Sequence, residues 1–249
     1  MLSIAVAAAV AAAIIPVRAQ AGAYPTNVCV SKKIKAAGKF CQGALTAWAK
    51  YQANPAADTG GVKRDAAIAK AAAKLAAVWD KADQGATKKG VDCTVTTVNA
   101  STAETDLRAA VDSLQTLIRA GGDDNDANDR KCRSKILKAA GKLCSGLLKA
   151  QSKHVKVPGK DRDRSKLTAS RDKATAKFTD AYAKASPLCT AAAPAAASVT
   201  GEVTTVESDT MISTTTSPGL PTVFTQEIPP TTVTYKGEDL KPLCSKGTP

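Results

Sequence analysis

The stretch CVSKKIKAAGKFC at residues 29–41 returns as CRSKILKAAGKLC at residues 132–144, and this pair of segments decides the fold. Nine of the 13 positions are identical at an offset of 103 residues, and the same offset carries Trp79 onto Tyr182. A similarity that recurs at one fixed offset indicates a duplicated structural unit. The sequence therefore predicts two copies of one repeat, aligned without a gap over about 55 residues.

Each copy has the pattern of an amphipathic helix followed by a second helix. In the second copy, apolar and small side chains recur at helical spacing on one face: Cys132, Ile136, Ala140, Leu143, Leu147 and Ala150. Lysines recur on another face: Lys131, Lys135, Lys138, Lys142, Lys149 and Lys153. Proline and glycine break the first helices at 54–61 and 158–159, and helical patterns resume at about 63–83 and 166–185. Because these connections are short, each copy should form an antiparallel hairpin.

One extra helix is expected between the copies. Ser101-Thr102-Ala103-Glu104 fits a capping box, and a stripe of apolar side chains follows until Gly121-Gly122. The pattern of the second copy shows no counterpart of this helix. The 60 residues after Cys189 contain 14 threonines and 7 prolines. This composition is typical of an extended tail, in which 222–226 and 231–235 are candidate short strands.

The sequence thus predicts an all-α fold of two tandem disulfide-bearing helical hairpins, with one extra helix between them and an extended Thr/Pro-rich C-terminal tail. The expected divisions are a signal peptide at 1–21, the first repeat with the extra helix at 22–122, the second repeat at 123–189 and the tail at 190–249. An apolar run that ends in small residues indicates the signal peptide. We expect a secreted or periplasmic protein that is not transmembrane once mature, because no later segment is apolar enough to span a bilayer.

Export to an oxidising compartment makes the cysteines disulfide candidates. Cys29 and Cys41 are twelve residues apart, roughly 18 Å along a helix, and cannot bond each other. In an antiparallel hairpin the end of the second helix returns to the start of the first. This geometry favours the pairs Cys29 with Cys93 and Cys132 with Cys189. Two outcomes stay open for Cys41 and Cys144, a bond across the repeat interface or two buried thiols, and Cys244 is left as a free or intermolecular thiol.

The pattern of a cysteine, spaced lysines, Ala-Ala-Gly-Lys and a second cysteine resembles the Ala/Lys/Cys-rich helical repeats of proteins exported by environmental proteobacteria. The resemblance covers about residues 29–93 and 132–189. It implies a helical, exported protein and no particular activity. Such repeats often carry a fourth cysteine on the second helix, near what is Ala71 or Ala174 here. Because this chain lacks it, the resemblance transfers no site residue.

The charge is distributed unevenly along the chain. Residues 24–189 carry 31 basic and 16 acidic side chains, whereas residues 190–249 carry 3 and 6. A basic body attracts polyanions such as nucleic acid, acidic glycans, lipopolysaccharide or anionic membrane surfaces. The alternative is that the lysines only form a solvated helix face. Aromatic residues are not interleaved with them, so specific nucleic-acid recognition is not expected.

The sequence contains no convincing catalytic, metal or cofactor motif. Asp124, Asp126 and Asn128 match the first three ligand positions of a calcium loop, but Lys135 stands where a bidentate glutamate is needed. A linker that caps the next helix explains this acidic loop better. His154 is the single histidine, and no nucleophile pattern frames it. We therefore expect no enzyme, no cofactor and no metal.

These observations favour an exported, non-enzymatic structural or interaction protein with a basic helical surface that binds polyanions unspecifically. The alternative is a self-assembling surface or extracellular protein linked through its tail and Cys244. An uncharacterised enzyme is the third hypothesis.

Overall fold

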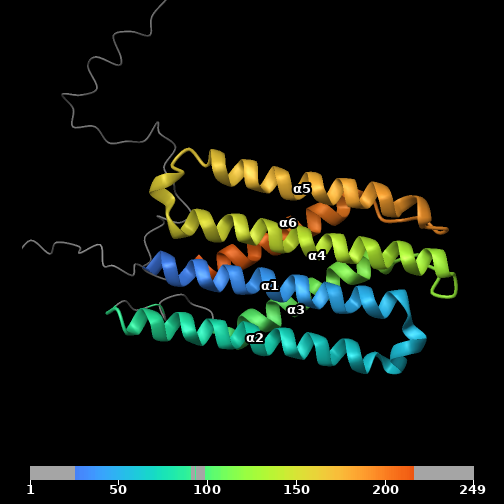
Figure 1. Cartoon of the computed structure of the whole chain (residues 1–249), viewed down its shortest axis with the longest axis horizontal. Helices are drawn as coiled ribbons and strands as arrows, with labels where there is room; N and C mark the ends of the chain where they lie inside the picture. The colour runs from blue at the N-terminus through green and yellow to red at the C-terminus, as the bar shows by residue number, and fades with distance from the viewer. Residues whose placement is uncertain (1–25, 91–92, 94–98, 216–249) are drawn as a thin grey trace, which may run out of the picture.

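The computed structural model describes residues 26–90, 93 and 99–215, and within these ranges every regular element is helical. The α-helices are α1 (Thr26–Ala53), α2 (Val62–Thr87), α3 (Ala100–Arg119), α4 (Ala127–Lys156), α5 (Ser165–Ala185) and α6 (Ala196–Thr215). Short 3-10 helices lie at Pro55–Gly61, Pro158–Lys160 and Ser186–Leu188. Helices α2, α1, α4 and α5 lie side by side in one layer, and α3 and α6 cross behind it (Figure 1). The predicted all-α fold of two tandem hairpins is confirmed.

Each hairpin turns at an aspartate that caps its second helix. The Asp58 carboxylate accepts the backbone N–H groups of Lys63 at 2.7 Å and of the following residue at 2.9 Å. Asp161, the equivalent residue of the second copy, accepts those of Lys166 at 2.9 Å and of the following residue at 3.0 Å. The first N–H groups of a helix have no partner within the helix and need such acceptors. The duplicated sequence therefore builds the same turn twice.

Helices α1 and α4 pack along each other in opposite directions at the centre of the molecule (Figure 1). A Cβ atom added to Gly38 would lie 3.0 Å from the Leu148 Cβ, and one added to Gly141 would lie 3.2 Å from the Leu45 Cβ. Gly38 and Gly141 are equivalent positions of the two copies, and so are Leu45 and Leu148. The contact is therefore the same from both sides, as in an interface around a twofold axis. The chain folds as a fused pseudo-dimer.

Hydrogen bonds between the two copies follow the same symmetry. The Ser31 hydroxyl on α1 donates to the backbone carbonyl of Ser152 on α4 at 2.7 Å. The equivalent hydroxyl of Ser134 on α4 donates to the backbone carbonyl of Ala49 on α1, also at 2.7 Å. Small side chains allow the two helices to approach this closely and let hydroxyls reach the opposite backbone. The central seam is thus a packed interface with polar contacts at both ends.

Two disulfides close the hairpins in the way that the antiparallel geometry predicts. Cys29 is bonded to Cys93 with their Cα atoms 6.3 Å apart, and Cys132 is bonded to Cys189 with a Cα separation of 5.2 Å. Each bridge ties the start of a hairpin's first helix to the chain beyond its second helix. The two ends of each hairpin are thereby held together.

The third disulfide joins the two copies. Cys41 is bonded to Cys144, and their Cα atoms are 6.4 Å apart across the seam between α1 and α4. Of the two outcomes that the sequence left open for these cysteines, the bond across the repeat interface is the one found. Because the two are equivalent residues, the bond lies close to the internal twofold axis.

The structure differs from the sequence prediction after Cys189. Residues 196–215, expected to belong to the extended tail, form α6 instead, and Val199, Val203 and Val206 on it are buried. Helix α3 begins seven residues after Cys93 and α6 begins seven residues after Cys189, and each is 20 residues long. The prediction that the second copy has no counterpart of the extra helix is therefore wrong. The repeat unit has three helices.

The reason for this error is that tertiary burial outweighs local propensity. Valine and threonine are weak helix formers because their branched side chains lose rotamer freedom against the preceding turn. In α6, however, the valines recur at helical spacing and pack against α3 and α4, and this burial stabilises the helix. The rest of the predicted tail, with both candidate strands and Cys244, lies outside the described residues, as does the predicted signal peptide.

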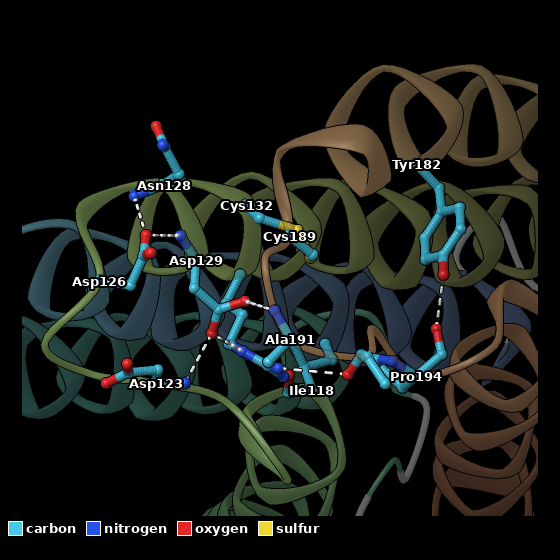
Figure 2. The surroundings of a disulfide bond; sticks show 12 residues. Ile118, Asp123, Asp126, Asn128, Asp129, Cys132, Tyr182, Cys189, Ala191 and Pro194 are labelled. Carbon is cyan, nitrogen blue, oxygen red and sulfur yellow. Dashed lines mark hydrogen bonds and ion pairs between the residues drawn. A yellow bond between two sulfur atoms is a disulfide. The ribbon is translucent and has the colours of Figure 1, made fainter.

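A fully buried ion pair connects the two repeats near the Cys132–Cys189 disulfide (Figure 2). Asp129 and Arg133 are both 0% exposed, and their side chains meet at 2.7 Å. The Arg133 guanidinium also donates to the backbone carbonyls of Ile118, Ala120 and Ala192. The Asp129 carboxylate accepts the backbone N–H groups of Asp123 and Ala191. The pair therefore fixes the end of α3, the start of α4 and the segment that leads to α6.

Among the helices of the described ranges, none combines the length and the apolar character needed to cross a membrane.

Candidate functional site

A cationic groove lies between α4 and α5. It encloses about 750 Å³, and five lysines line it: Lys142, Lys149, Lys153, Lys173 and Lys177. All five side chains are exposed. No acidic residue is among those that line the groove in the described part of the chain. The lysine charges are therefore not neutralised by lining residues of opposite sign.

The floor of this groove is apolar and is set by the packing of the hairpin. Leu143 from α4 and Phe178 from α5 lie beneath the lysines and are almost fully buried. A Cβ added to Gly146 would lie 2.9 Å from the Ala174 Cβ, so the two helices approach closely at this glycine. The lysines stand on both sides of the line where the helices meet. Lysine side chains can keep the ammonium group in water while their methylene stems lie along apolar surface, and these five lysines are exposed beside an apolar floor.

A second hollow of about 320 Å³ adjoins the groove, and Lys149 and Lys153 line both. Its other lining residues are Val28, Ser31, Lys32, Lys35, Ser152 and Lys156. We call the eight lysines of the two hollows the lysine surface: Lys32, Lys35, Lys142, Lys149, Lys153, Lys156, Lys173 and Lys177. The surface extends from α5 over α4 to the start of α1, and it therefore belongs to both repeats.

Three of the six lysines that the sequence predicts on one face of α4 belong to this surface. Lys142, Lys149 and Lys153 line the hollows. The remaining three, Lys131, Lys135 and Lys138, are exposed on α4 but line neither hollow.

Sequence reasoning missed the lysines that other helices contribute. Lys32 and Lys35 are equivalent to Lys135 and Lys138 at the offset of 103 residues, so the repeat itself could have indicated them. Lys173 and Lys177 are four residues apart on α5 and therefore share one helix face. Only the packing of α5 against α4 shows that this face meets the stripe on α4.

His154 is part of a buried polar contact that supports the second hairpin. Its Nδ1 lies 3.0 Å from Asp161 Oδ2, and both side chains are almost fully buried. Burial alone would raise the pKa of Asp161. The hydrogen bonds from the Lys166 backbone, from His154 and from the next backbone N–H outweigh it and hold this pKa below its usual value. The pair links the end of α4 to the start of α5, which is a structural role.

Asp161 makes the second hairpin sensitive to acid. Because its pKa is lower in the folded protein than in the unfolded chain, its contacts contribute stability above the unfolded pKa, and this contribution is lost as the pH falls below about 4. We expect the Tm to drop over this range and Asp161→Asn to reduce the drop, as measured by thermal unfolding between neutral and acid pH. Asp180→Asn, at an exposed position of α5, is the control and should leave the profile unchanged. An unchanged profile in Asp161→Asn would contradict the assignment.

The acidic loop before α4 acts as a capping linker. The Asp126 carboxylate accepts the backbone N–H groups of Asn128 at 2.6 Å and Asp129 at 3.0 Å, and the bond from Asp129 is the main reason that its pKa is lowered. Asp124 accepts a hydrogen bond from the side chain of Gln52 at 2.7 Å, which with nearby Arg119 lowers its pKa. The two carboxylates are thus engaged by different partners. The arrangement is that of the predicted N-cap and not of converging calcium ligands.

One group of metal-ligand side chains does gather among the described residues: Cys29, Asp83 and Cys93. The two sulfur atoms are bonded to each other, so they do not offer thiolates to a metal. The Asp83 carboxylate instead pairs with the ammonium group of Lys33 at 2.8 Å, and Lys33 is 1% exposed. The Lys33 ammonium also lies 5.0 Å from the centre of the Trp79 ring. This cluster stabilises the disulfide-bonded end of the first hairpin, which lies opposite the turn.

Comparisons of the chain with protein-family models, with curated proteins and with solved structures found no match.

Proposed function

We propose that this protein is an exported, non-enzymatic binding protein whose lysine surface holds polyanions by charge. The observation that carries the proposal is the union of two hollows that, among the described residues, are lined by eight lysines and by no acidic side chain. Lysine is a compact point charge on a flexible stem, which suits phosphate, sulfate and carboxylate groups without selecting one geometry. Binding should therefore depend on charge density and not on the sequence of a polymer.

Export is part of the same proposal. Three disulfides among the described residues favour an oxidising compartment, and the apolar segment at 1–21 has the pattern of a signal peptide. The periplasm, the cell surface and the medium are rich in anionic polymers and surfaces. A chain of net charge +13 is attracted to them over roughly 10–30 Å at ionic strengths of about 0.1–0.01 M.

The test is a charge reversal on the lysine surface with a control that has the same net charge. Lys142→Glu, Lys149→Glu and Lys153→Glu together should lower the affinity for heparin about tenfold or more, and should reduce the slope of log K against log salt by about three. The control reverses Lys81, Lys88 and Lys89, which are exposed but line neither hollow. Affinity is measured by titration calorimetry at several salt concentrations. Equal losses in both triple variants would show that net charge alone drives binding and that the surface is not a site.

A further inference from the structure

A third hollow, a cavity of about 530 Å³, lies where α3 and α6 pack against each other, with Ala37 of α1 and Trp79 of α2 also in its wall. The residues that line it from the two helices are Ala103, Asp106, Leu107, Ala109, Ala110, Ser113, Glu202, Thr205, Val206, Asp209 and Thr210. Because α6 was not expected from the sequence, this cavity is a product of the tertiary structure alone. It shares no lining residue with the lysine surface.

Equivalent positions of the two repeats line this cavity. Helices α3 and α6 begin at the same distance after Cys93 and Cys189, so their residues correspond one to one. On this correspondence Asp106 matches Glu202, Ala109 matches Thr205, Ala110 matches Val206 and Ser113 matches Asp209. The cavity is therefore built around the internal twofold axis of the molecule.

The charge of this cavity is opposite to that of the protein as a whole. Three carboxylates line it, Asp106, Glu202 and Asp209, and no lysine or arginine of the described residues does so. The chain as a whole has a net charge of +13. Asp106 and Asp209 are exposed and make no hydrogen bond or ion pair with another described residue. A cation could therefore approach them without displacing an existing partner within the described chain.

The carboxylates lie toward the two ends of the cavity. The Ser113 hydroxyl donates to Glu202 Oε1 at 2.7 Å, which places these two residues side by side. Helices α3 and α6 run in opposite directions (Figure 1). Residues that precede Ser113 on α3 therefore lie at the same end of the cavity as residues that follow Glu202 on α6. Asp106 lies seven residues before Ser113, and Asp209 lies seven residues after Glu202, so both reach the other end, about 10 Å away at 1.5 Å per residue.

The middle of the cavity is mostly apolar. Ala109, Ala110 and Val206 lie between the two charged ends, together with Thr205. Trp79 is 2% exposed, and its indole N–H finds no acceptor among the described residues. The Nε1 atom itself is shielded from solvent, and the indole adds apolar ring surface to the wall of the cavity.

We propose that this cavity binds an aliphatic α,ω-diamine, with one ammonium group at Glu202, the other at Asp106 and Asp209, and the methylene chain over the apolar middle. Each ammonium group would form charge-assisted hydrogen bonds to a carboxylate. The methylenes would be removed from water against alanine, valine and the Trp79 indole. A monoamine would satisfy one end only, and an anion would be repelled by all three carboxylates.

The first experiment is titration calorimetry of the full secreted chain with a series of diamines and with matched monoamines. 1,7-Diaminoheptane, whose extended length is close to the rise of seven helical residues that separates the two ends of the cavity, should bind about tenfold more tightly than n-heptylamine, because it gains a second charge-assisted contact. Affinity should pass through a maximum near this chain length. Equal affinity of the diamine and the monoamine, or no heat with either, would overturn the proposal.

Substitutions at each end then test the placement. Glu202→Gln, or Asp106→Asn with Asp209→Asn, should each reduce diamine affinity to that of the monoamine, a loss of about tenfold. Asp112→Asn is the matched control, because Asp112 is an exposed carboxylate of α3 that does not line the cavity. Ala109→Phe should block the apolar middle and abolish binding, while far-UV circular dichroism verifies that the variant is folded. An equal loss in Asp112→Asn would show that the effect comes from overall charge and would reject this site.

Discussion

Replacement of Arg133 by methionine should lower the free energy of unfolding by about 3–5 kcal/mol. Methionine keeps much of the side-chain volume but leaves the Asp129 carboxylate, which is 0% exposed, without its counter-charge. It also removes the donor to the backbone carbonyls of Ile118, Ala120 and Ala192. Loss of one member of a buried ion pair is costly because the remaining charge cannot be solvated. Chemical denaturation followed by circular dichroism at neutral pH measures the effect.

A surface pair with the same spacing provides the control. Glu104 and Arg108 on α3 are also four residues apart and meet at 2.8 Å, but their side chains are 30% and 40% exposed. Arg108→Met should therefore cost less than about 1 kcal/mol. Replacing Asp129 as well, in the variant Asp129→Leu with Arg133→Met, should recover part of the lost stability, since no buried charge is then unpaired. Similar small losses in Arg133→Met and Arg108→Met would show that the buried pair does not hold the junction together.

Removal of the disulfide between the repeats should lower the free energy of unfolding by at least as much. The bond between Cys41 and Cys144 closes a loop of 103 residues, and the loss of such a constraint on the unfolded chain is worth about 4–5 kcal/mol. The variant Cys41→Ala with Cys144→Ala should keep its helical circular dichroism spectrum, because the packing of α1 against α4 remains. Its unfolding midpoint in denaturant should shift strongly to lower concentration.

A single substitution distinguishes the stability that the disulfide bond contributes from the stability that packing of the two sulfur atoms contributes. Cys41→Ala alone also breaks the bond, so it should lose nearly the same stability as the double variant when both are measured without reductant. Addition of reductant should lower the stability of the wild type and leave the double variant less affected. If the double variant unfolds at the same denaturant concentration as the wild type, the bond does not constrain the unfolded chain as this estimate requires.

Much of the fold could be predicted because its determinants are local or repeated. The helical spacing of Ile136, Leu143 and Leu147 fixes the inward face of α4 without knowledge of its partner, and all three are buried. The pairing of Cys29 with Cys93 follows from the direction in which a hairpin returns. Because the two segments at 29–41 and 132–144 are so similar, one correct hairpin implied the other.

Helix α6 could not be predicted in the same way because its signal is not local. Its valines and threonines have the composition of an extended tail, and they become a helix only where α3 and α4 supply a surface on which Val199, Val203 and Val206 are buried. The candidate sites likewise depend on contacts between helices that no local sequence pattern reveals. The lysine stripe of α4 was visible in the sequence, but its continuation through Lys173 on α5 and Lys32 on α1 depends on how the helices pack.

The sequence by itself determined the helical class, the duplication, the turns and the two disulfides within the hairpins. Each of these depends on the spacing of residues along one chain segment or on an identity that recurs at a fixed offset. The tertiary structure alone decided the twofold relation of α1 and α4, the bond between Cys41 and Cys144, the third helix of the second repeat and the acidic cavity between α3 and α6. These features join segments that are far apart in the chain, and no local periodicity encodes which faces of two helices will meet.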